Sequence, residues 1–243
     1  LYLFFVQSVQ FFLSQCKDIG RRRSGEAEEL YCASCSYMEN LNGCDSGTGI
    51  LRSGKNVNYM KYFVLSDIHG SSYYAKKALD IYQEGEFDRI LLLGDILYHG
   101  PRNELPKGHA PKEVIALLNP LKEEILAVRG NCEAEVDQMV LHFPVMADYA
   151  VLELGERSVF MSHGHLYTNE TFPLRKNGDV FLQGHTHLPV AEKKERDGLF
   201  YYHLNPGSVS LPKEGNPNSY GVLTEKGFQI FTLDASLVKE VAF

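Results

Sequence analysis

Basic residues are too few in this sequence to give it an excess of positive charge. Over 243 residues, Lys and Arg number 24 whereas Asp and Glu number 31, so the formal net charge is −7 at pH 7. Proteins that bind a nucleic-acid backbone normally present a basic face, so this balance argues against a nucleic-acid polymer as partner. A small anionic substrate is compatible with the composition, provided that local positive charge holds it.

Long apolar runs are also absent. The opening stretch, LYLFFVQSVQFFL, is interrupted by Gln7, Ser8 and Gln10, whereas a transmembrane helix needs about 20 predominantly apolar residues. The same stretch lacks the basic region and the small-residue cleavage site of a secretory signal. We therefore expect no membrane partner and no export.

Cysteine is scarce after residue 60, where Cys132 is the only one. The other four lie upstream, at Cys16, Cys32, Cys35 and Cys44. Cys32 and Cys35 form half of a zinc pattern, but no second half follows nearby, so we favour a chance pair. One cysteine in the main part of the chain and no export signal predict a reducing compartment, the cytoplasm.

The sequence changes character at Met60, where the stretch MKYFVLSDIHG begins. The length suits one good-sized domain, and the chain shows no internal repeat and no low-complexity segment. We expect residues 1–59 to be an N-terminal extension, poorly ordered or artefactual, and residues 60–243 to form the domain.

From Met60 onward, short β-rich runs alternate with segments of helical spacing. Strands are predicted at 61–66, 89–93 and 124–128, and helices at 72–83, 111–122 and 133–143. After Pro144 the sequence is rich in β-formers, with strands predicted at 149–154, 158–162, 179–183, 200–205, 219–224 and 228–233. This order predicts the α/β class, with two β-sheets packed face to face and helices outside.

Five of these predicted strands are followed by polar side chains that can bind a metal. In chain order these are Asp67 and His69, Asp95, Asn131, His163 and His165, and His185 and His187. In α/β folds ligands gather at the carboxyl ends of strands. Taken singly, an Asp in this position usually caps a helix or turn, and a lone His is usually structural. Five such strand ends in succession favour a metal site.

The mixture of imidazole and oxygen donors, without thiolate, suits Mn, Fe, Zn, Co or Ni. Seven ligands are too many for one ion and suit two ions that share a bridging carboxylate. Two aspartates offset only half of the charge of two divalent ions, so the site would attract an anion. Paired ions about 3.5–4 Å apart generate a hydroxide nucleophile and stabilise displacement at phosphorus.

The order D-x-H, G-D, G-N, H-G-H, G-H-T-H resembles that of the calcineurin-like metallophosphoesterase superfamily. Within that superfamily, the domain resembles the small bacterial YfcE-type phosphodiesterases, whose fold is shared by the metallophosphoesterase-like subunit of retromer. The stretches that carry the resemblance include LGDILYHGPRN, AVRGNCEAEVDQM, SHGHLYTNE, GHTHLPVAE and NPGSVSLPK. The resemblance implies two packed mixed β-sheets flanked by helices. It does not extend to residues 1–59.

The resemblance also implies a role for each polar strand end. One ion would be held by Asp67, His69 and His187. The other would be held by Asn131, His163 and His185, with Asp95 bridging the two ions.

One position departs from the broad superfamily, in which a His commonly follows the G-N pair and contacts the phosphate or protonates the leaving group. Here Cys132 takes its place, as it does in the YfcE-type group. A thiol with an ordinary pKa near 8.5 is a poorer acid at neutral pH than an imidazolium. His99 and His165 are the candidates to replace it as acid or phosphate contact. Alternatively, each could form a hydrogen bond that orients a metal-binding side chain. Cys132 itself is not expected to be the nucleophile.

Two further residues follow the predicted bridging carboxylate in a polar loop. Arg102 and Asn103 could reach a phosphate oxygen or the leaving group, although an ordinary solvated loop explains them equally well. Residues 205–210, NPGSVS, are interpreted as a structural turn beside the site.

The function predicted from these features is a metal-dependent phosphodiesterase that acts on a small anionic phosphodiester. Two divalent metal ions would act as cofactors, and Mn(II) is the metal we expect first. A homo-oligomer is compatible with the sequence. Two alternatives remain, a phosphomonoesterase of the same superfamily and a non-catalytic scaffold like the retromer subunit. The physiological substrate is not identified by the sequence.

Overall fold

The computed structural model describes residues 19–24, 27–32 and 60–243. Contacts between Cα atoms divide the chain into two units, Leu1–Asn58 and Tyr59–Phe243. In the first unit, strands β1 (Ile19–Ser24) and β2 (Ala27–Cys32) pair antiparallel, an element that the sequence pattern did not predict. The rest of the expected extension, with the opening apolar run, lies outside the described residues, and its poor order stays a prediction.

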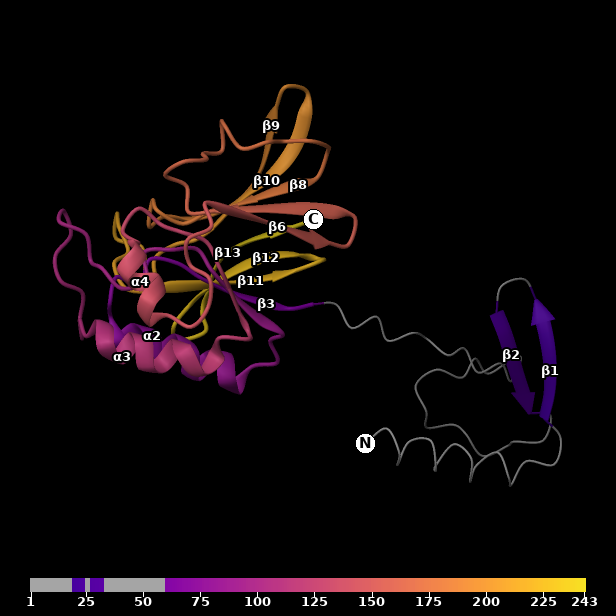
Figure 1. Cartoon of the computed structure of the whole chain (residues 1–243). Helices are drawn as coiled ribbons and strands as arrows, with labels where there is room; N and C mark the ends of the chain where they lie inside the picture. The colour runs from indigo at the N-terminus through magenta and orange to yellow at the C-terminus, as the bar shows by residue number, and fades with distance from the viewer. Residues whose placement is uncertain (1–18, 25–26, 33–59) are drawn as a thin grey trace. The chain divides into compact units, whose positions relative to one another are not determined.

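Residues 60–243 form two mixed β-sheets with few helices (Figure 1). The first sheet has the strand order β13-β12-β11-β3-β4-β5, in which β3, β4 and β5 are parallel. Its strands are β3 (Tyr62–Leu65), β4 (Arg89–Leu92), β5 (Ile125–Ala127), β11 (Ser219–Thr224), β12 (Gly227–Thr232) and β13 (Leu237–Ala242). The second sheet has the order β6-β7-β8-β10-β9, in which β7, β8 and β10 are parallel. Its strands are β6 (Tyr149–Leu154), β7 (Arg157–Ser162), β8 (Asp179–Leu182), β9 (Pro189–Arg196) and β10 (Leu199–Pro206).

Strand β3 shows how the two layers share one core. Its side chains alternate between the two faces of the first sheet, as they do in any strand. Tyr62 and Val64 pack in a buried cluster with apolar side chains of the second sheet, whereas Phe63 and Leu65 pack in a cluster with the helices. Both faces of β3 are therefore buried, which explains why the strand is apolar throughout.

Two helices, at residues 72–84 and 111–118, pack on one face of the first sheet (Figure 1). Helix α2 (Ser72–Glu84) begins at Ser71, whose hydroxyl accepts a hydrogen bond from the Tyr74 amide, and α3 (Pro111–Leu118) continues into the short 3₁₀ helix η1 (Asn119–Leu121). Helix α4 (Glu135–Val140) is shorter than predicted. The outer face of the second sheet is covered by a loop whose Phe172 packs on Phe181. The predicted sandwich is thus confirmed, with helices on one side. None of the helices in the described part of the chain has the length and apolar character needed to cross a membrane.

A buried histidine in strand β10 predicts a pH-dependent stability. The Gln183 amide donates to His203 Nε2 at 2.9 Å, so His203 is neutral with its proton on Nδ1, which has no hydrogen-bond partner. Burial, followed by the charge of Lys194, lowers the pKa of His203 to about 4. The ordinary pKa of a histidine, as in the unfolded chain, is about 6.5. Between that pH and about pH 4, His203 therefore binds a proton in the unfolded chain but not in the folded one. The free energy of unfolding should therefore decrease as the pH falls, by up to about 3 kcal/mol from this group.

The measurement is urea unfolding at pH 7 and pH 4.5, with a chelator present so that bound cations do not contribute. In His203→Gln the decrease in unfolding free energy on acidification should be smaller than in the unmodified protein. An equal decrease in the two proteins would contradict this account of His203.

Candidate metal centre

The polar residues predicted from the sequence follow parallel strands of both sheets. Asp67 and Asp95 come directly after the neighbouring strands β3 and β4, and their loops are joined by backbone hydrogen bonds. The Asp67 amide donates to the Gly94 carbonyl at 3.2 Å, and the His69 amide donates to the Asp95 carbonyl at 2.8 Å. Because the carboxyl ends of parallel strands meet at one edge of a sheet, these side chains lie together.

Three of the predicted ligands form a first buried group: Asp67, His69 and His187. The Nε2 atoms of His69 and His187 lie 3.2 Å apart, and they are 3.6 Å and 3.2 Å from Asp67 Oδ1. Asp67 Oδ1 is buried and receives no hydrogen bond. Three electron-pair donors thus face one point.

The backbone sets the protonation of these two imidazoles. His69 Nδ1 donates to the Tyr98 carbonyl at 2.9 Å, and His187 Nδ1 donates to the Leu211 carbonyl at 2.5 Å. A neutral imidazole carries one N–H, so both Nε2 atoms present lone pairs. Two lone pairs 3.2 Å apart repel each other unless a cation lies between them, which is the arrangement of metal-ligating histidines.

Asp95 connects this group with a second one. Its Oδ2 lies 3.7 Å from His69 Nε2, and its Oδ1 lies 3.4 Å from His163 Nε2. His163 Nδ1 donates to the Leu93 carbonyl at 2.6 Å, and Nε2 lies 3.2 Å from Asn131 Oδ1. The two oxygens of one carboxylate therefore face histidines of two different groups.

His185 borders the same site from strand β8. Its amide donates to Asp67 Oδ2 at 3.1 Å, and its ring centroid lies 5.0 Å from that of His163. The structure therefore brings all seven predicted ligands to one region. Six of them are linked by the side-chain distances above, whereas His185 is linked through its backbone and its ring contact.

The backbone at the site is unusual. Eight non-glycine residues of the described chain have positive φ, and five of them are predicted ligands: Asp67, His69, Asp95, His185 and His187. This region of conformational space is unfavourable for residues with a side chain, and such residues concentrate at functional sites. Glycine is required nearby for a different reason, since a Cβ at Gly184 would collide with Ser66 Oγ and one at Gly130 with Asp95 Oδ1.

The electrostatics of the cluster favour a bound cation. In the protein without a bound cation, burial opposes the charge of Asp67, but the close imidazoles of His187 and His69 outweigh burial when a proton on Nε2 faces the carboxylate, and they hold its pKa well below the usual value. Burial likewise opposes the charge of His163, but the carboxylates of Asp95 and Asp67 raise its pKa to about 9. The site thus keeps its carboxylates ionised and attracts positive charge, and its nitrogen and oxygen donors fit a divalent transition metal.

The three residues proposed as acid or phosphate contact lie beside the cluster. The Cys132 amide donates to Asp95 Oδ1 at 2.9 Å, and burial and then the Asp95 carboxylate raise the pKa of the Cys132 thiol, which stays neutral. Burial and then the charge of His163 lower the pKa of His165 to about 4. His99 Nδ1 is buried without a hydrogen-bond partner, and its ring packs against His109.

A cleft of about 450 Å³ opens over the cluster. It is lined by Asp95, Arg102, Asn103, Asn131, His185, Thr186, His187 and Lys213. The two predicted substrate-binding residues, Arg102 and Asn103, thus border the cleft. Lys213 and Thr186 do so as well, although sequence reasoning missed them. His99, His165 and Cys132 are not among the described residues that line it.

Two groups of supporting residues hold the cluster in place. Residues 205–210, predicted as a structural turn, contribute the hydroxyls of Ser208 and Ser210, which both donate to the Asp67 carbonyl at 2.9 Å. The buried carboxylate of Glu133 accepts from the amides of Asp95, Ile96 and Gly130 at 2.9, 2.6 and 2.5 Å. Sequence reasoning did not assign this role to Glu133.

The sequence is similar to those of known proteins. The family model of the calcineurin-like phosphoesterase superfamily domain matches residues 60–227. Phosphodiesterase YfcE of Escherichia coli (strain K12) is 45% identical over 184 residues, which cover 75% of this chain and 98% of that protein. The probable metallophosphoesterase YsnB of Bacillus subtilis (strain 168) is 28% identical over 172 residues, covering 68% of this chain and 84% of that protein.

A solved structure agrees with the sequence matches. The phosphoesterase YfcE from E. coli superimposes with a TM-score of 0.72 at 44% identity, covering 75% of this chain and 99% of that chain. The resemblance inferred from the strand-end motifs is thereby confirmed, together with the fold of two mixed sheets.

Proposed function

Because this chain belongs to the calcineurin-like phosphoesterase superfamily and is a phosphoric ester hydrolase, we propose that it is a phosphodiesterase with a dinuclear metal site. Water would add across a P–O bond of a small phosphodiester, giving a phosphomonoester and an alcohol. Identity of 45% to a phosphodiesterase over nearly the whole of that relative supports the diester as substrate.

The position of Asp95 is the observation that carries the dinuclear proposal. One of its carboxylate oxygens faces His163 and the other faces His69, so a single side chain spans both donor groups. Asp67, His69 and His187 would hold one ion. Asn131, His163 and His185 would hold the other. When bound, two divalent ions supply a hydroxide nucleophile at neutral pH and stabilise the oxygens of the displacement at phosphorus.

The remaining residues of the site bind the substrate and handle protons. Arg102 and Asn103 border the cleft and would contact a phosphate oxygen or the leaving group. His165, with a pKa lowered to about 4, is uncharged at neutral pH, so it would contact a phosphate oxygen rather than donate a proton. The neutral thiol of Cys132 and the imidazole of His99 are the remaining candidates to donate one.

The test is hydrolysis of bis(para-nitrophenyl) phosphate by protein freed of metal with a chelator and then supplied with Mn²⁺, Zn²⁺, Fe²⁺, Co²⁺ or Ni²⁺. We expect no turnover without metal, recovery with added metal and about two ions per chain by elemental analysis, with Mn²⁺ expected to be the most active. Para-nitrophenyl phosphate, a monoester with the same leaving group, should be cleaved more slowly. Faster cleavage of the monoester would favour a phosphomonoesterase.

A protein that takes up no metal and cleaves neither ester would contradict the proposal. In that case the retromer-subunit-like scaffold would be the better explanation. The cytoplasmic location and a homo-oligomeric state stay predictions from the sequence.

A further inference from the structure

The cleft carries two cationic side chains that the cluster itself does not need. Arg102 and Lys213 both line the cleft, and both are exposed. Among the described residues, no acidic side chain forms an ion pair with either of them. Glu104 and Glu214 lie nearby in the two loops but do not line the cleft. In a chain with a net charge of −7, this is a local excess of positive charge.

Both cations sit on loops that are tied to the metal-ligand candidates. The loop that carries Arg102 is held through the Tyr98 carbonyl, which accepts from His69 Nδ1 at 2.9 Å. The loop that carries Lys213 is held through the Leu211 carbonyl, which accepts from His187 Nδ1 at 2.5 Å. The hydrogen bonds that aim the two imidazoles therefore also anchor the loops that carry the two cations.

The second loop has further anchors close to Lys213. The Leu211 amide donates to Ser208 Oγ at 2.8 Å, and Ser208 in turn donates to the Asp67 carbonyl. Beyond Leu211 the chain turns, with the Asn216 amide and side chain both donating to the Lys213 carbonyl at 3.0 and 2.8 Å. The loop is thus anchored to the cluster at Leu211, and a local turn orders its backbone at Lys213.

We propose, on the basis of the function proposed above, that Lys213 and Arg102 form a subsite for a second anionic group of the substrate, and that Arg102 binds this group in place of the contact with the scissile phosphate or leaving group considered for it above. The physiological substrates would then be phosphodiesters that carry an additional phosphate or carboxylate beyond the scissile phosphate. A cleft of about 450 Å³ is of small-molecule size and exceeds the space that one phosphate group fills. A diester with a single negative charge would not balance two unpaired cationic side chains in such a cleft. A substrate with a further anionic group would balance them.

The experiment compares two substrates that differ only in one phosphate, thymidine 5′-(para-nitrophenyl phosphate) and the same compound with a 3′-phosphate. Both release para-nitrophenolate by the same P–O cleavage, so the ratio of their kcat/KM values reports the additional anion. We expect the metal-loaded protein to prefer the 3′-phosphorylated compound. Lys213→Gln should reduce this ratio about five- to tenfold, and Lys213→Glu should reduce it further through repulsion.

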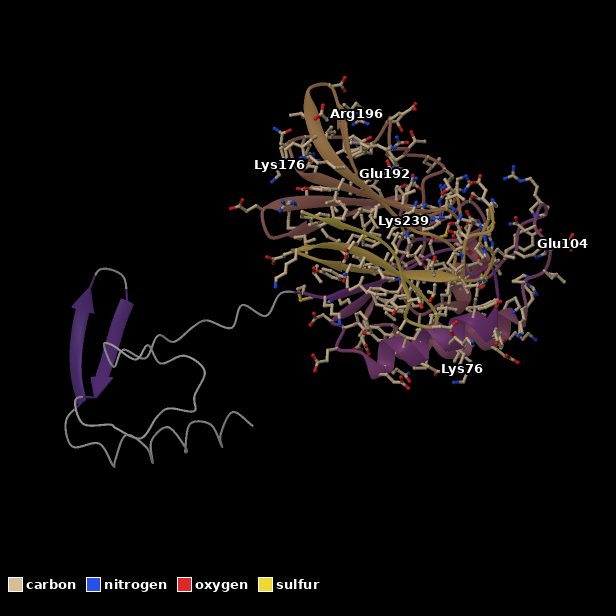
Figure 2. All side chains as sticks on the ribbon, turned by 180° about the vertical axis from the view of Figure 1, so that it is seen from behind. Lys76, Glu104, Lys176, Glu192, Arg196 and Lys239 are labelled. Atoms are coloured by element: carbon tan, nitrogen blue, oxygen red, sulfur yellow. The ribbon has the colours of Figure 1, made fainter. Side chains whose placement is uncertain are left out.

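A matched control removes the same charge elsewhere. Lys76 lies on helix α2 (Figure 2) and does not line the cleft, so Lys76→Gln should keep both the ratio and the rates. Raising the salt concentration should diminish the ratio in the unmodified protein because exposed charges are screened. Arg102→Gln should lower the ratio in the same direction as Lys213→Gln.

Binding provides a readout that does not depend on turnover. In titration calorimetry with chelator-treated protein, thymidine 3′,5′-bisphosphate should bind more tightly than thymidine 5′-monophosphate, and Lys213→Gln should remove this difference. An unchanged ratio and an unchanged difference in affinity in Lys213→Gln would overturn the subsite while the phosphodiesterase stands. Failure to cleave either substrate would overturn the proposed function itself, and the subsite with it.

Discussion

Replacing Asp95 by Asn is expected to lower kcat/KM for bis(para-nitrophenyl) phosphate by on the order of 10³-fold. The amide keeps the shape of the side chain and an oxygen that can accept from the Cys132 amide, as Asp95 Oδ1 does at 2.9 Å. What it loses is the charge that faces His69 and His163 from the middle of the cluster. The loss should appear in kcat/KM and in the metal content per chain.

A second readout follows the metal-free protein. Because the carboxylates of Asp95 and Asp67 raise the pKa of His163 to about 9 against the effect of burial, Asp95→Asn should lower that pKa in an NMR titration. Asp80→Asn makes the same chemical change on the exposed surface of helix α2, where Asp80 pairs with Lys76, and should change neither turnover nor metal content. Turnover by Asp95→Asn equal to that of the unmodified protein would refute the dinuclear proposal.

The location of the site could be predicted because its signal is local in sequence. Buried parallel strands are apolar on both faces, so runs such as residues 62–65 are easily recognised, and the polar residue that follows each run marks its carboxyl end. Parallel pairing then brings Asp67 and Asp95 to the same edge of the first sheet. The convergence of His163 and His187 on the same place depends on how the two sheets pack. The sequence pattern predicted it only from the succession of strand ends, and the family resemblance supplied which residue would hold which ion.

Two strands within residues 60–243 escaped prediction, and both lie at the edges of the sheets. Strand β9, PVAEKKER, is largely charged, and strand β13, LVKEVA, carries a Lys-Glu pair at its centre. Both strands are partly exposed, and charge on an edge strand discourages pairing with other chains. Their sequences therefore lack the apolar run that marks the central strands. The Lys239 ammonium on β13 donates to the Pro189 carbonyl on β9 at 2.8 Å, so the two edges lie side by side, and Figure 2 labels Lys239 among the surface side chains.

The supporting residues were missed for a different reason. Glu133 bonds to the amide of Asp95, which lies 38 residues earlier in the chain, and Lys213 reaches the cleft through a loop after the second sheet. Neither contact leaves a periodic or spaced pattern in the sequence. Glu133 stands in the G-N-C-E motif, and a carboxylate close to a turn is more often a solvated group than a buried acceptor.

Truncating Glu133 to Ala is expected to destabilise the protein by about 3–5 kcal/mol, because three buried backbone donors lose their acceptor and each unpaired donor costs about 1–3 kcal/mol. Those donors lie at the ends of β4 and β5, on the amides of Asp95, Ile96 and Gly130. The change should therefore also displace Asp95 and reduce metal binding. Urea unfolding of the chelator-treated protein measures the first effect, and elemental analysis of the reloaded protein measures the second.

Glu133→Gln distinguishes hydrogen bonding from charge. Oε2 of Glu133 accepts from two amides, Asp95 and Gly130, whereas Oε1 accepts only from Ile96. A glutamine can keep the first two bonds through its oxygen, but its NH₂ group then faces the Ile96 N–H, donor against donor. The cost should be about 1–2 kcal/mol, smaller than that of Ala. The exposed Glu123→Ala should stay within about 0.5 kcal/mol of the unmodified protein. Equal costs for Gln and Ala would mean that the negative charge of Glu133, and not its three accepted hydrogen bonds, holds the ends of the two strands together.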